Sequence, residues 1–271
     1  MSIERVPILM YHRIGETKSD WERKYCIGAR QFEAHMTMLA RAGWRALTLA
    51  DFFRWVSGTI ELDEPSFLLT FDDGFLGVHE HAGPVLKEMQ WPATVFLVSA
   101  LLGERDQWTA TSNPSGTTHP LMNANHIEDL RKQHFSFQSH TRTHADLPTL
   151  NDAALCDQLA GSRTDLEALL GAPVEYLAYP YGRLDDRVCA AAKEAGYRAA
   201  FSVQPGFNRR DVDRFRLRRL DVFGTDSASA LMRKISLGSN DGSIGHAVKY
   251  AMSRVAARLG GRQEPRSGDG A

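Results

Sequence analysis

The stretch SFLLTFDDG at residues 66–74 carries the clearest structural signal in this sequence. Its first six residues are short and predominantly apolar, which is typical of a buried β-strand. Two adjacent aspartates and a glycine follow at once, and these residue types end a strand in a turn. The stretch therefore predicts a buried strand with two carboxylates at its carboxyl end.

Short apolar runs alternate with segments of helical period on both sides of this strand. Further strands are predicted at 6–11, 93–98, 134–138, 174–179 and 198–203, and helices at 31–42, 49–56, 75–89, 126–132, 152–170, 185–195 and 246–259. This alternation favours a parallel sheet with crossover helices, either open or closed into a barrel. We expect one catalytic domain at residues 1–260 and a disordered tail at 261–271, which lacks an apolar anchor.

The composition is typical of a folded domain and argues against a nucleic-acid-binding protein. Hydrophobic residues make up 43% of the 271 residues and charged residues 24%, which is ordinary for a folded domain. Lys plus Arg number 32 against 33 Asp plus Glu, so no nucleic-acid partner is expected. A local basic stretch at 209–219 is interleaved with acidic residues, and we interpret it as a solvated, ion-paired segment.

The cysteines and the hydropathy pattern bear on localisation. The three cysteines are widely spaced, which predicts neither a disulfide framework nor a thiolate metal site. No run approaches the ~18 apolar residues of a membrane span, and the first residues lack the pattern of a signal peptide. We therefore expect a cytoplasmic protein without a transmembrane segment.

Four polar clusters fall at the carboxyl ends of predicted strands: Tyr11-His12, Asp72-Asp73, residues 140–144 and residues 179–182. In parallel α/β folds, ligands and catalytic groups collect at that edge of the sheet. Adjacent aspartates in one cleft would repel each other unless a cation neutralises one of them. Taken alone, the pair could equally form a turn and cap a helix.

A histidine pair provides partners for such a cation. His140 and His144 are four residues apart in SHTRTH, directly after a predicted strand. On a single helical turn, two imidazoles at that spacing face the same way and can bind one metal. Two histidines and one carboxylate leave a coordination position open, which suits catalytic zinc or a similar divalent ion. The second aspartate can then act as a general base.

TFDDG at 70–74 followed by SHTRTH at 139–144 resembles the first two motifs of the NodB-homology polysaccharide deacetylases, carbohydrate esterase family four. The resemblance implies a distorted (β/α) barrel of about seven parallel strands in a single domain. It also implies that Asp72 is the general base. The implied metal ligands are Asp73, His140 and His144, holding one divalent ion, with zinc expected and cobalt, nickel or manganese as alternatives.

The segment Tyr179-Pro180-Tyr181-Gly182 is similar to the family's third motif. There the backbone N–H at the position of Tyr181 helps to hold the oxyanion, and we assign Tyr179, Pro180 and Tyr181 to oxyanion and substrate binding. The family's motif usually begins with an arginine that pairs with the catalytic aspartate, but Ala178 stands at that place. Four arginines are candidates to replace it: Arg142, Arg183, Arg216 and Arg218.

The general acid also departs from the family's usual pattern. Most members carry Leu-x-His near the C-terminus, and no such match follows residue 198. LMYH at 9–12 instead resembles the N-terminal Met-Tyr-His of the poly-N-acetylglucosamine deacetylase branch. We therefore expect His12 to protonate the leaving amine, with a purely structural hydrogen bond as the alternative. Trp108, in the long polar segment 103–125, is a candidate to stack on a sugar or to anchor its loop.

These assignments predict a hydrolase that releases acetate from an N-acetylamino sugar in a polysaccharide or glycan precursor. A cytoplasmic precursor, such as a sugar-lipid or nucleotide-linked intermediate, fits the expected localisation. One alternative is a related hydrolase that acts on a non-sugar amide or imide. The other is a catalytically silent glycan-binding domain.

Overall fold

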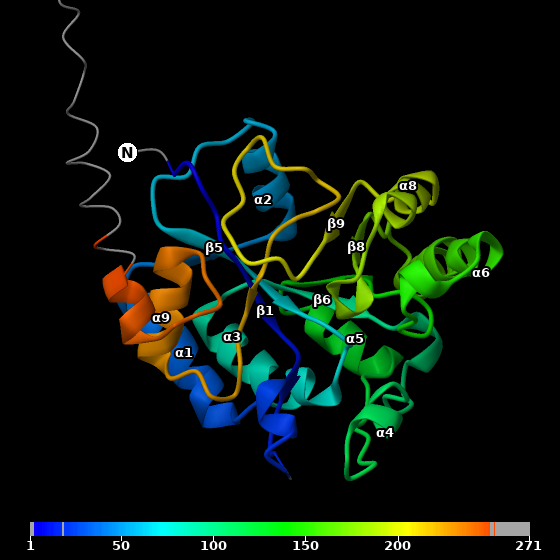
Figure 1. Cartoon of the computed structure of the whole chain (residues 1–271), viewed down its shortest axis with the longest axis horizontal. Coiled ribbons are helices and arrows are strands. Elements are labelled where there is room, and N and C mark those ends of the chain that lie inside the picture. The colour runs from blue at the N-terminus through cyan, green and yellow to red at the C-terminus, as the bar shows by residue number, and fades with distance from the viewer. Residues whose placement is uncertain (1–2, 18, 250–251, 253–271) are drawn as a thin grey trace, which may run out of the picture.

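The computed structural model describes residues 3–17, 19–249 and 252 of the chain. Eight strands form its main sheet: β1 (Ile8–Tyr11), β4 (Arg45–Leu47), β5 (Ser66–Phe71), β6 (Ala93–Leu97), β7 (Phe135–Ser139), β8 (Tyr176–Ala178), β9 (Ala199–Phe201) and β10 (Leu220–Asp221). Seven of them follow the order β10-β1-β5-β6-β7-β8-β9, and every pairing is parallel. This sheet curls into a half-barrel (Figure 1), which confirms the predicted distorted (β/α) barrel.

Helices cover both faces of the sheet. They are α1 (Ala29–Arg41), α2 (Leu49–Val56), α3 (Gly83–Met89), α4 (Thr109–Ser112), α5 (Ala124–Arg131), α6 (Asp152–Cys156), α7 (Ser162–Leu170), α8 (Asp186–Glu194) and α9 (Ala228–Leu237). Helices α1, α3 and α5 lie along one side of the sheet, whereas α2 lies on the other (Figure 1). A small second sheet pairs β2 (Arg13–Ile14) with β3 (Cys26–Ile27).

The buried side chains explain why the strands read as continuous apolar runs. In β1, Leu9 and Tyr11 contact the larger core cluster beneath α1, α3 and α5. Ile8, the residue before Leu9, contacts the smaller cluster that includes Phe52 and Trp55 of α2. Alternate residues of a strand point to opposite faces, so a sheet covered on both faces needs apolar residues at every position.

The predicted ranges of β5 and α2 agree with the structure, whereas other elements differ. The helix predicted at 152–170 contains a π-helical turn at Asp157–Gly161 between α6 and α7. Strands β4 and β10 and helix α9 were missed, because the two strands are only three and two residues long and α9 buries a lysine, Lys234, on its core face. Residues 244–249 are helical, and most of the helix predicted at 246–259 and the tail at 261–271 lie outside the described residues.

The strand register brings the expected polar clusters to one edge. Tyr11 of β1 pairs with Phe71 of β5, so His12 and Asp72 follow on neighbouring strands. Met10 of β1 pairs with Asp221 on its other side. Within the described part of the chain, no helix is long and apolar enough to cross a membrane.

Candidate active site

The two aspartates sit in a tight turn at the end of β5. The backbone N–H of Asp72 donates to Tyr11 O at 2.9 Å, which continues the strand pairing by one residue. Asp73 has a φ of 72° and Gly74 a φ of 77°, and a side chain at Gly74 would meet Leu97 Cδ2 at 2.7 Å. Glycine is therefore required there. The turn holds both carboxylates almost completely buried, at 2% and 5% exposure.

The two histidines are brought together by an irregular loop after β7. The prediction that they share a helical turn is wrong, because Thr141 and His144 have φ angles of 69° and 60°. The loop is closed by a hydrogen bond of 3.1 Å from the His144 N–H to Thr141 Oγ1. Such left-handed residues are strained and concentrate at functional sites. The loop brings His140 Nε2 and His144 Nε2 within 3.4 and 3.3 Å of Asp73 Oδ1.

The donor set of Asp73, His140 and His144 fits a divalent metal ion. One ligand atom from each residue lies within 4.8 Å of the others, and all three residues are buried. Asp73 Oδ1 accepts no hydrogen bond from the described residues, an arrangement that is costly for a buried carboxylate unless a cation lies beside it. His140 Nδ1 donates to the Ala178 carbonyl at 2.8 Å, which leaves the Nε2 lone pair directed toward Asp73.

The protonation states of these groups follow from burial and charge. Burial by itself would raise the pKa of Asp73, but the neighbouring imidazoles outweigh burial and lower it. Burial lowers the pKa of His144 to about 3. His144 is therefore held in its neutral form, which is the form that binds metals.

Arg219 supplies the arginine that is missing at Ala178. Its Nη1 and Nη2 donate to the two carboxylate oxygens of Asp72 at 2.7 and 2.8 Å, and its Nε donates to Ser202 O at 2.9 Å. Burial by itself would raise the pKa of Asp72, but the charges of Arg219 and His140 outweigh burial and lower it to about 2. Asp72 is therefore held ionised in a fixed orientation.

The four arginines predicted for this role are all engaged elsewhere. Arg142 binds Asp157 and Asp165, Arg183 binds Asp146, Arg216 binds Asp186, and Arg218 donates to the Pro205 carbonyl. The prediction that one of them pairs with Asp72 is wrong, because each guanidinium forms ion pairs or hydrogen bonds with nearby surface carboxylates or carbonyls. None of these four guanidinium groups makes a hydrogen bond to Asp72 within the described structure.

The interpretation of the basic stretch at 209–219 is correct in part. Arg216, with its side chain 38% exposed, forms the expected surface ion pair, but Arg219 is completely buried. Residues 215–219 alternate between the two sides of the chain. Phe215, Leu217 and Arg219 are buried, and Arg216 and Arg218 between them point outward. That alternation was the signal that could have identified Arg219.

His12 lies in the same cavity as the aspartates. Its ring packs against Tyr25 with centroids 5.0 Å apart, and its charge lowers the pKa values of Asp72 and Asp73. Asp221 of β10 also lines this cavity; burial raises its pKa, and His12 acts in the opposite direction. The role of His12 as general acid stays a prediction; the structure shows that His12 and the aspartates line one cavity.

The cavity over these residues has a volume of about 460 Å³, which is in the range of small-molecule sites. Trp108 and Tyr181 flank His144 in it, with ring centroids 4.3 and 4.5 Å from the imidazole. Tyr179 also borders the cavity, but its hydroxyl donates inward to the Phe215 carbonyl at 3.2 Å. Pro180 is buried in the turn. Of the predicted third-motif trio, Tyr181 alone presents a half-exposed side chain, at 52%.

Comparison with known proteins points to one family. The family model for polysaccharide deacetylases matches residues 59–200, just over half of the chain. YxkH of Bacillus subtilis strain 168, provisionally assigned as a polysaccharide deacetylase, is 27% identical over 226 residues, which cover 83% of this chain and 74% of YxkH. The poly-beta-1,6-N-acetyl-D-glucosamine N-deacetylase of Staphylococcus aureus strain MRSA252 is 24% identical over 191 residues, covering 67% of this chain and 62% of that protein. A crystal structure of a polysaccharide deacetylase from Bacillus cereus has a TM-score of 0.71 at 27% identity, covering 85% of this chain and 69% of that one.

Proposed function

This chain belongs to the polysaccharide deacetylase family, and we propose that it is a metal-dependent hydrolase that removes N-acetyl groups from an N-acetylamino sugar of a glycan. One observation carries the proposal. A buried, ionised carboxylate, Asp72, lies beside a separate three-ligand metal site in one cavity, with Asp72 Oδ2 3.9 Å from His140 Nε2. This arrangement separates the group that takes a proton from the groups that hold the ion.

Each residue has a defined part in the hydrolysis. Asp73, His140 and His144 would hold a divalent ion, which would supply polarisation of the acetyl carbonyl and a more acidic water molecule. Asp72, held ionised by Arg219, accepts the proton of the attacking water. His12 gives a proton to the sugar nitrogen as the C–N bond breaks, because an amine leaves poorly without it. The products are acetate and a free amino sugar.

Groups around the cavity complete the proposal. The backbone N–H of Tyr181 donates to the oxyanion that forms on the carbonyl oxygen. We propose zinc as the ion because two imidazoles and one carboxylate with an open position are typical of catalytic zinc. We also propose a cytoplasmic location, in keeping with three cysteines that form no disulfide.

Asp72→Asn tests the assignment of the base. The amide keeps the size of the side chain but cannot accept a proton, so acetate release should fall by ~10²–10⁴-fold. Metal content should be unchanged, because Asp72 is not among the three ligands. The matched control is Asp186→Asn, since the Asp186 side chain is 99% exposed and lies outside the cavity.

The measurement is acetate release from N-acetylglucosamine oligomers with and without a chelator, alongside metal analysis of each variant. Chelator-sensitive release by the wild type and loss of release in Asp72→Asn support the proposal. Full activity in Asp72→Asn refutes the role of Asp72. Absence of metal after reconstitution with zinc refutes the metal-dependent reaction and favours a silent glycan-binding domain.

A further inference from the structure

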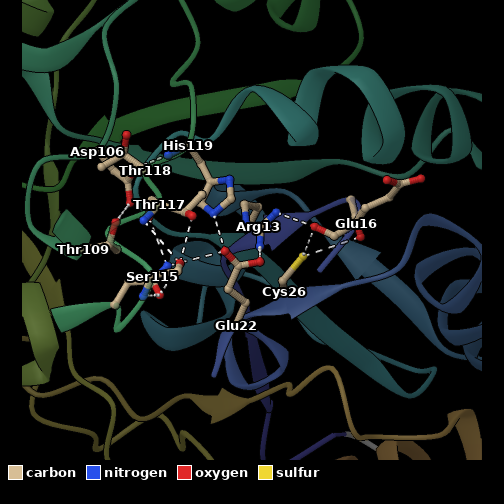
Figure 2. Close-up of polar contacts among 12 residues, drawn as sticks. Arg13, Glu16, Glu22, Cys26, Asp106, Thr109, Ser115, Thr117, Thr118 and His119 are labelled. Carbon is tan, nitrogen blue, oxygen red and sulfur yellow. Dashed lines mark hydrogen bonds and ion pairs between the residues drawn. The ribbon is translucent and has the colours of Figure 1, made fainter. Parts of the chain in front are cut away.

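Two loops meet over the metal site and are joined through one buried carboxylate. The first loop lies between β1 and β3 and contains β2 and residues 19–25, and the second, residues 98–122, follows β6. Figure 2 shows Glu22 of the first loop between Arg13 and His119, with Arg13 Nη2 donating at 2.9 Å and His119 Nε2 at 3.0 Å. Asn113 Nδ2 of the second loop lies 3.5 Å from the same carboxylate. We call these four residues, Arg13, Glu22, Asn113 and His119, the Glu22 clasp.

The hydrogen bonds of the clasp are buried and converge on one carboxylate, which distinguishes them from a surface contact. Glu22 is only 4% exposed, and a buried carboxylate is tolerated only where several donors satisfy it. Burial lowers the pKa of His119, so the imidazole is neutral and acts as a hydrogen-bond donor to Glu22. Asp106 braces the second loop from within, since it accepts from Thr109 Oγ1 and from the His119 N–H (Figure 2).

The first loop is also joined on its other side to the segment after β10. The Gly224 N–H donates to Arg23 O at 2.9 Å. A side chain at Gly224 would lie 2.1 Å from Cys26 O and 2.4 Å from Arg23 O, so only glycine permits this approach. Lys24 Nζ lies over the rings of Tyr25 and Phe223, at 4.9 and 5.9 Å from their centroids.

These two joints connect segments that border the cavity. Trp108, Glu22, Lys24 and Phe223 of these segments all line it, and we call them the wall. A polymer that is modified at an internal sugar must leave the site in two directions, so a wall that closed one side would favour chain ends. A sugar at the end of a chain needs only one opening.

We propose that this cavity admits a chain-terminal N-acetylated sugar end-on and excludes internal sugars of a polymer. The proposal rests on the proposed deacetylase function and narrows its substrate class. The volume of about 460 Å³ is in the range of pockets for a small ligand. The Glu22 clasp and Gly224 are then specificity determinants, because they close the wall without touching the metal ligands.

The test maps which sugar loses its acetyl group. β-1,4- and β-1,6-linked N-acetylglucosamine pentamers, labelled at the reducing end, are incubated with the zinc-loaded protein, and the products are sequenced by tandem mass spectrometry. The wild type should deacetylate one terminal sugar. At equal total sugar concentration, its rate should fall in inverse proportion to chain length. Deacetylation of internal sugars by the wild type overturns the inference.

Two variants open the wall at different points. Glu22→Ala removes the acceptor of the clasp, and Gly224→Ala forces the segment after β10 away from the first loop. Each should raise the ratio of internal to terminal deacetylation by roughly ten-fold, a discrimination typical of pocket shape. The control is Glu104→Ala, an exposed residue of the second loop, which should keep the wild-type product pattern.

The wild-type product map alone decides the inference if a variant fails to fold, as judged by thermal melting. Unchanged product patterns in two folded variants overturn the role of the wall. Release of acetate from no N-acetylated sugar, including the free monosaccharide, refutes the proposed function and the inference with it. Internal deacetylation by the wild type refutes the inference alone.

Discussion

Arg219→Met should be among the most damaging single substitutions in this protein that leave the metal ligands intact. Arg219 is completely buried and donates two charge-assisted hydrogen bonds, of 2.7 and 2.8 Å, to Asp72. Removing one member of a buried ion pair costs about 3–5 kcal/mol, because the other charge is left unpaired. At roughly 2–4 °C per kcal/mol, the melting temperature should fall by about 6–20 °C.

A double-mutant cycle with Asp72→Asn separates this interaction from the loss of packing. Urea unfolding of the wild type, both single variants and the double variant, all freed of metal, should give a coupling free energy of at least about 1.5 kcal/mol. The double variant should recover much of the lost stability, since neither charge remains. Arg216→Met is the control: its side chain is 38% exposed and pairs at the surface, so it should cost less than about 1 kcal/mol.

The same variant has a separate signature in activity. Acetate release should fall because Asp72 loses its fixed orientation. Zinc content should be unchanged, because the hydrogen bonds of the Arg219 side chain go to Ser202 and Asp72 and not to Asp73, His140 or His144. Arg219→Lys keeps the charge but not the paired donors, so its activity should be intermediate. Equal melting temperatures for Arg219→Met and Arg216→Met, or additive free energies in the cycle, would refute the reasoning.

Two further predictions concern ring packing and thiol burial. Trp108→Ala should weaken zinc binding by about 10–100-fold. Trp108 stacks on His144, and the stacking orients this imidazole, because its Nδ1 finds no hydrogen-bond partner among the described residues. Competition with a chromophoric chelator measures the affinity for zinc, and an unchanged affinity contradicts the prediction. Thiol labelling at pH 8 should modify the exposed Cys156 in the folded protein. Cys26 should react only after unfolding, because it is 2% exposed and burial raises its pKa to about 11; rapid labelling of Cys26 under native conditions would contradict its burial.

The parallel α/β framework and the three residues of the candidate metal site could be predicted from local sequence patterns. Apolar strands and helical periods are local patterns, and they identified β5 in its full extent, Ser66–Phe71. Parallel strands place their carboxyl ends at one edge, so Asp73 and the two histidines could be expected together before any contact was known. The structure places their ligand atoms within 4.8 Å.

The tertiary structure alone decided how that cluster is held and what surrounds it. Asp72 and Arg219 are 147 residues apart, and they meet because the two-residue strand β10 pairs beside β1. So short a strand has almost no periodic pattern to reveal it. The turn that carries His144 and the Glu22 clasp are likewise decided by long-range contacts. Whether an arginine or a glutamate is solvated or buried depends on the partners that folding brings to it, and a local pattern carries little information about those partners.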